Sequence, residues 1–248
     1  SDVVTLKNLV AEVKALGISK SLFILDHGFY SENNIKEMND ANIDFIIPLP
    51  FSVNVGKGLI SETNREIESP ANAKRFGGDI FYVLESEIQI GSVDAYGYVL
   101  FNKKREGLET NSFYNRLIDI ECAIDGKEFR NPIYQFKRTA GNFERYFEYT
   151  LEGKKIHLSR RVNAISQAVN RFGKTILLSS SKRSWDEVLS LYRERDEVEK
   201  KFDDLKNELE VMPLRVQKVE TLQGLLFIFF ISLVLRAILL RRAREAKL

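Results

Sequence analysis

The sequence has 248 residues, 44% of them hydrophobic, which is enough for one large domain or two smaller ones with a hydrophobic core. Its 37 basic and 35 acidic side chains leave a net charge of only +2, so the overall charge does not indicate a nucleic-acid partner. A single cysteine excludes an internal disulfide, and two histidines are too few for a zinc site of cysteines and histidines. We therefore expect a protein of a reducing compartment, the cytoplasm, in which any metal would be a hard cation on oxygen ligands.

The N-terminal segment predicts alternating helices and strands. Apolar residues between positions 3 and 16 recur with a helical period, and the run SLFIL (21–25) is typical of a buried strand. A second helix is expected to begin near Ser31, and DFIIPLP (44–50) predicts another buried strand. Helix, strand, helix, strand is an α/β arrangement.

The next segment, 52–173, changes character. Short aromatic and β-branched runs such as DIFYVLE and LIDIECAI alternate with glycine-containing turns, which predicts a mostly β insertion domain. The strand-like run KTILLSS (174–180) then returns to the buried type. We therefore expect an α/β core made of residues 1–51 and 174–248, interrupted by the insertion.

The basic residues are segregated. No Asp or Glu occurs between Gly153 and Trp185, while eight cations do. A solvated loop surface explains such a run, and so does contact with a phosphate backbone. The eight are Lys154, Lys155, Arg160, Arg161, Arg171, Lys174, Lys182 and Arg183.

An apolar run near the C-terminus, LLFIFFISLVL (225–235), contains eleven residues and is followed by Arg236. A bilayer span needs about 20 apolar residues, and an arginine within it costs about 2.5–3.5 kcal/mol. We expect a buried helix here. The weaker alternative is a membrane anchor whose following basic residues face anionic lipid.

A long helix is predicted from Trp185 to the proline at 213, with Ser184 and Glu187 forming a capping box at its start. Its apolar positions predict a core-facing seam, and a coiled coil also fits them. A second, polar stripe shares one face of the helix and is displaced from the seam by about 100°. Its members are Tyr192, Arg195, Glu199 and Lys206.

The spacing of this stripe resembles the Y-R-E-K motif of the insertion-sequence-four group of DDE transposases. The stretch LDHGFYSENNI, which contains Asp26, is similar to that group's segment around the second catalytic aspartate. The resemblance covers nearly the whole chain. It implies an RNase H-like core interrupted by a β-rich insertion, and an enzyme that cuts and joins transposon DNA.

The resemblance also implies the roles of individual residues. Asp26 and Glu199 would bind two Mg²⁺ (or Mn²⁺) ions, a pair of ions suited to phosphodiester cleavage and strand transfer. Tyr192, Arg195 and Lys206 would contact phosphates of the transposon end. From the basic run we add Arg160, Arg161, Lys182 and Arg183 as expected DNA contacts. DNA, both transposon ends and target, is the expected partner; the oligomeric state stays open, with a homodimer considered.

The sequence departs from the family pattern in two places. The first catalytic aspartate of the family has no counterpart that we assign here, so we expect a core that is incomplete at its N-terminus and a truncated transposase. His27 stands where many relatives have arginine, and we interpret it as structural. A catalytically inactive DNA-binding remnant is the main alternative, and a membrane-anchored coiled-coil interaction protein is a weaker one.

Overall fold

The computed structural model describes residues 2–18, 21–64, 66–195 and 219–245. The chain divides into two compact units, Ser1–Val188 and Leu189–Leu248, and each is described by itself. The predictions for Glu199 and Lys206 concern residues outside the described ones.

The first unit opens with the predicted alternation of helices and strands, which is confirmed. Ser31 caps the second helix, because its Oγ accepts the backbone N–H of Asn34 at 3.1 Å. Gly17, with φ +69°, stands two residues after the end of the first helix, as predicted from the sequence. The elements are α1 (Asp2–Ala15), β1 (Leu22–Ile24), the 3₁₀ turn η1 (His27–Phe29), α2 (Glu32–Asp40) and β2 (Asp44–Pro48).

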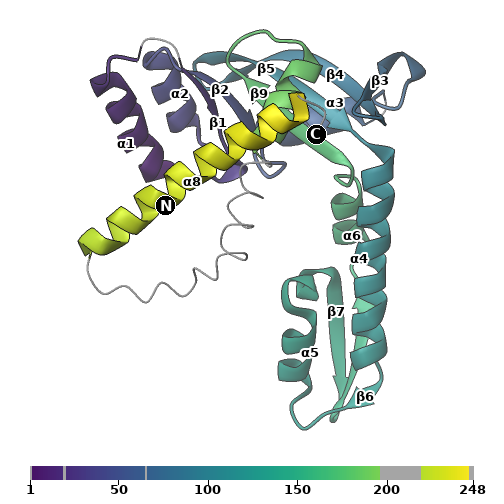
Figure 1. Ribbon diagram of the computed structural model, residues 1–248. Helices are drawn as coiled ribbons and strands as arrows, with labels where there is room; N and C mark the ends of the chain where they lie inside the picture. Colours follow the sequence, from purple (N-terminus) through teal and green to yellow (C-terminus); the bar gives the residue numbers. More distant parts are fainter. Residues whose placement is uncertain (1, 19–20, 65, 196–218, 246–248) are drawn as a thin grey trace. The chain divides into compact units, whose positions relative to one another are not determined.

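The main sheet has six strands in the order β1-β2-β9-β5-β4-β3 (Figure 1). Strands β1 and β2 are parallel, and the other neighbours are antiparallel. The remaining strands are β3 (Ala73–Phe76), β4 (Asp79–Ile90), β5 (Val93–Phe101) and β9 (Lys174–Ser179). Strand β9, predicted at 174–180, therefore joins the N-terminal strands to strands of the segment 52–173 in one sheet. The buried side chains of α1, α2 and this sheet form the first core, which includes Leu6, Ile35, Met38, Phe45 and Leu178.

The segment 52–173 is not mostly β, and this expectation is wrong. Besides strands, its described residues form four helices, α3 (Asn54–Thr63), α4 (Lys103–Ile124), α5 (Pro132–Ala140) and α6 (Val162–Val169). Helix α4 contains the run LIDIECAI, for which the sequence pattern predicts a strand. Its buried residues are Phe113, Leu117, Ile120 and Ile124, spaced four, three and four, which is a helical period.

A second core lies within the same unit. It is built from α4, α5, α6, the 3₁₀ turn η3 (Gly141–Tyr146) and a three-stranded antiparallel sheet in the order β6-β8-β7 (Figure 1). These strands are β6 (Lys127–Glu128), β7 (Phe147–Glu152) and β8 (Lys155–Arg160). The ring of Phe113 contacts those of Tyr146, Phe172 and Phe143 at centroid distances of 4.9, 5.3 and 5.4 Å. Aromatic contacts of this kind explain the many rings in the segment.

In the second unit, α8 (Val219–Glu245) contains the apolar run 225–235. We expected a buried helix, and this is wrong for the described side chains, because Phe227 is 65% exposed and Ile228 60%. Among the described helices, none has the length and apolar character that crossing a membrane requires.

Candidate functional site

Asp26 follows strand β1 and begins the turn η1. Its Oδ1 accepts the backbone N–H of His27 at 2.6 Å and lies 2.8 Å from His27 Nδ1, which donates to it. The carboxylate is 41% exposed, and the imidazole is 71% exposed. A partly exposed carboxylate at the end of a strand, held by hydrogen bonds from His27, is suited to binding a cation. His27 orients Asp26, which agrees with its interpretation as a structural residue.

The turn that carries Asp26 is anchored to α2. Asn34 is fully buried, and its Nδ2 donates to the backbone carbonyl of Phe29 at 2.8 Å. Phe29 and Tyr30 pack against the first core, as expected for aromatic residues that follow a buried strand. Burial, with a smaller effect of the nearby Glu32, raises the pKa of Tyr30 above its ordinary value of 10.0. The position of the Asp26 carboxylate is therefore set by the packed helix beneath it.

The long helix begins at Trp185 as predicted, and the backbone N–H of Val188 donates to the carbonyl of Ser184 at 3.1 Å. The chain just before it is held by Tyr98, which is 1% exposed. The Tyr98 hydroxyl donates to the carbonyl of Arg183 at 2.7 Å and accepts its backbone N–H at 3.1 Å. Burial is the main cause that raises the pKa of Tyr98, so this hydroxyl stays protonated.

The Arg183 side chain extends this connection to the sheet. Its guanidinium lies 2.6 Å from Glu187 in the helix that begins at Trp185, and 3.4 Å from Asp44 at the start of β2. Asp44 in turn accepts the hydroxyl of Ser180 at 2.7 Å. Neither Tyr98 nor Asp44 is predicted as a functional residue from the sequence. A tyrosine within the apolar strand run YGYVLF was the available signal, because a buried hydroxyl needs a partner.

Two members of the polar stripe are described. Tyr192 and Arg195 share a face of the helix that begins at Trp185, and the Arg195 guanidinium carbon lies 5.3 Å from the centre of the Tyr192 ring. This is a cation–π distance. Tyr192 and Arg195 belong to the second unit, whereas Asp26 belongs to the first.

The basic run does not remain a uniform charged surface. Arg160 makes two hydrogen bonds of 2.6 Å to the carboxylate of Glu121, and Arg161 lies 3.6 Å from Glu148. Lys182 is exposed and lines a hollow of about 170 Å³ whose rim includes Glu85 and Glu87. The structure therefore places acidic side chains beside cations that are isolated from them in the sequence.

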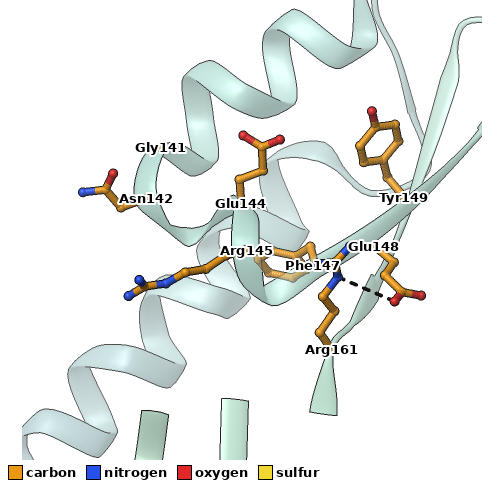
Figure 2. Close-up of a pocket in the computed structure, with 8 residues that line it drawn as sticks. All are labelled: Gly141, Asn142, Glu144, Arg145, Phe147, Glu148, Tyr149 and Arg161. Carbon is orange, nitrogen blue, oxygen red and sulfur yellow. Dashed lines mark ion pairs between the residues drawn. The ribbon is translucent and has the colours of Figure 1, made fainter. Parts of the chain in front are cut away.

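A pocket of about 710 Å³ lies over η3 and β7 (Figure 2). The ion pair of Arg161 and Glu148 lies on one side of it, and Arg145 and Glu144 also face it. The formal charges of two arginines and two carboxylates cancel, so the lining does not favour a phosphate over a neutral polar group. The remaining lining residues are Gly141, Asn142, Phe147 and Tyr149.

Within the described residues, no three His, Cys, Asp or Glu side chains gather in a way that could hold a metal ion. The one predicted ligand that is described, Asp26, supplies carboxylate oxygens, which suit Mg²⁺. Asp26 thus fits a metal ligand by chemistry and exposure.

A family model described as "Transposase DDE domain" matches residues 1–235, which is nearly the full length of the sequence. No curated protein and no solved structure matches the chain.

Proposed function

Because the chain belongs to the transposase DDE domain family, an enzyme family that cleaves DNA and transfers its strands, we propose that Asp26 and Glu199 bind the metal ions of this reaction. The family implies a role in DNA transposition and an RNase H-like fold, and its members generally use divalent metal ions. We further propose the insertion-sequence-four group, from the spacing of Tyr192, Arg195, Glu199 and Lys206.

The observation that supports this assignment is the geometry at Asp26. Its carboxylate stands at a strand end, is 41% exposed, and is oriented by His27 from one side. When bound, a pair of Mg²⁺ or Mn²⁺ ions activates the attacking oxygen and stabilises the leaving one. The contribution of the chain is to hold the carboxylate in place, through the buried amide of Asn34 and the turn that it anchors.

For DNA binding we propose Tyr192, Arg195 and Lys206 as contacts to phosphates of the transposon end. The Arg195 guanidinium lies at a cation–π distance from the Tyr192 ring, and its planar fork of N–H donors suits bidentate phosphate binding. Arg160, Arg161, Lys182 and Arg183 remain predicted DNA contacts. The limits of the insertion at 52 and 173 and a homodimeric state also remain predictions.

The test is metal-dependent cleavage of DNA that carries the element's terminal repeats. The protein used is the chain with any segment encoded in frame before it. Asp26→Asn and Glu199→Gln should each lower the cleavage rate at least 10³-fold, about 4 kcal/mol of transition-state stabilisation. Asp40→Asn is the matched control, because Asp40 is an exposed carboxylate at the end of α2.

Two results would change the assignment. Cleavage at the same rate without either carboxylate would show that Asp26 and Glu199 are not the metal ligands. Salt-sensitive DNA binding without any Mg²⁺-dependent cleavage would instead identify a DNA-binding protein that has lost catalysis.

A further inference from the structure

We propose that a groove between α3 and α6 binds a phosphodiester group of DNA, through residues other than Asp26 and the polar stripe. The inference rests on the proposed function in DNA binding and adds a contact surface to it. The groove has a volume of about 180 Å³, and its polar lining residues are Lys57, Ser61, Asn64, Gln167, Asn170 and Arg171.

The charge of the lining is the first argument. It includes two cations, three amides and no carboxylate. Within the described part of the chain, neither Lys57 nor Arg171 forms a salt bridge, whereas Arg160 and Arg183 both do. Arg171 comes from the basic run, and folding brings it to the same groove as Lys57, which is far away in the sequence. An acid-free groove with two cations from separate elements is a suitable site for an anion.

The second argument is that Lys174 occupies the edge of the groove, where α3 and α6 end. Asn64 and Asn170 are the C-caps of α3 and α6, and helix C-termini carry partial negative charge. Lys174 bonds to both: its Nζ donates to the side-chain oxygen of Asn64, and to the backbone carbonyl of Asn170 at 2.8 Å. Burial is the main cause that lowers the pKa of Lys174, while the carboxylates of Glu106 and Glu68 act in the opposite direction.

The bond from Lys174 also fixes the amide of Asn64. Because Oδ1 accepts from Lys174, Nδ2 is left as a donor. With Lys174 bound to the two helix ends, the charges of Lys57 and Arg171 are left for a ligand.

The size and chemistry of the groove match a phosphodiester. A volume of 180 Å³ corresponds to about six water molecules at about 30 Å³ each, enough for a phosphate and part of its sugar. The Arg171 guanidinium offers a planar fork and Lys57 a point charge, the two usual ways of binding phosphate oxygens. The Gln167 amide can donate to a sugar or phosphate oxygen.

The experiment measures the affinity of the chain for a random-sequence 30-base-pair duplex by fluorescence anisotropy across a series of salt concentrations. Lys57→Ala and Arg171→Ala should each weaken binding several-fold at 0.1 M salt. Each should also reduce the slope of log K against log salt by about 0.9, the value for one lost phosphate contact. Lys57→Arg should retain the slope. Lys74→Ala is the matched control, because Lys74 is an exposed cation on β3, outside the groove.

A second measurement does not depend on substitution. Bound duplex should protect Lys57 from acetylation, detected by mass spectrometry, and leave Lys74 reactive. If the unsubstituted chain binds DNA and neither alanine variant changes the slope, the groove is not a phosphate site and the proposed DNA function stands. If the unsubstituted chain does not bind DNA at any salt concentration, the proposed DNA function fails as well.

Discussion

The bond between Tyr98 and Arg183 gives the sharpest stability prediction, because Tyr98→Phe removes one oxygen atom and little else. The hydroxyl makes two hydrogen bonds, of 2.7 and 3.1 Å, and the side chain is 1% exposed. At about 1 kcal/mol for each hydrogen bond, the loss is about 2 kcal/mol. For a chain of this size that lowers the unfolding midpoint by about 4–8 °C.

The assay is unfolding of the full chain by urea, which gives the free energy, and by heat, which gives the midpoint temperature, both followed by circular dichroism and tryptophan fluorescence. The single tryptophan, Trp185, is the first residue of the helix that Tyr98 holds in place, so its fluorescence reports directly on this region. Tyr134→Phe is the control, because Tyr134 is 61% exposed, and it should change the free energy of unfolding by less than about 0.5 kcal/mol. Equal stability of the two variants would refute the argument.

The pH dependence gives an independent check. The folded-state pKa of Tyr98 is raised above the ordinary 10.0, so the unfolded chain releases this proton at a lower pH than the folded chain. The stability linked to neutral Tyr98 is therefore fully present below pH 10 and is lost as the pH rises from there through the folded pKa. Tyr98→Phe should make this alkaline loss shallower, with the part due to Tyr30 remaining.

Three further substitutions have defined outcomes. Gly173→Ala should lower the free energy of unfolding by about 1–3 kcal/mol more than Gly17→Ala, since φ is about +70° at both positions but only at Gly173 would Cβ lie 2.6 Å from a backbone oxygen. Equal losses in urea unfolding would contradict this. Asn34→Ala should cost about 1–3 kcal/mol, because the carbonyl of Phe29 loses its buried donor; a loss below 0.5 kcal/mol would show that the turn does not depend on it. Lys182→Ala should reduce the salt slope of DNA binding by about 0.9, and an unchanged slope would remove Lys182 from the proposed contacts.

The sequence predicted the elements around Asp26 because each has a local signal. The apolar run 21–25 ends at a carboxylate, Ser31 caps the next helix, and Gly17 has the positive φ of a helix stop. Such signals depend on residues a few positions apart, and the structure follows them. The same holds for Tyr192 and Arg195, whose spacing alone puts them on one helix face.

The strand prediction for LIDIECAI in α4 is wrong because this run fits both the period of a strand and the period of a helix. In LIDIECAI, a strand would place Ile118 on the same face as Ile120 and Ile124. A helix buries Leu117 in its place. The structure buries Leu117 and leaves Ile118 46% exposed, so packing of the second core decides between the two periods.

The contacts of Tyr98 with Arg183, and the shared groove of Lys57 and Arg171, could not be predicted in this way. Each pair joins segments far apart in the chain, and only the folded arrangement of those segments brings them together. The pairing of the basic run with acidic side chains could not be predicted from the sequence either. Its cations are isolated from acids in the sequence, but folding pairs Arg160 on β8 with Glu121 on α4.

The central claim is the proposal that Asp26 and Glu199 bind metal ions at one site. Its most direct test is iron-directed cleavage of the polypeptide. Fe²⁺ takes the place of Mg²⁺, and with ascorbate and peroxide it produces radicals that cut the backbone near the bound ion. We predict cuts around both residue 26 and residue 199, prevented by excess Mg²⁺ and lost at both places in Asp26→Asn and in Glu199→Gln. Cuts near only one of the two residues, or cuts that persist in both variants, would contradict the account.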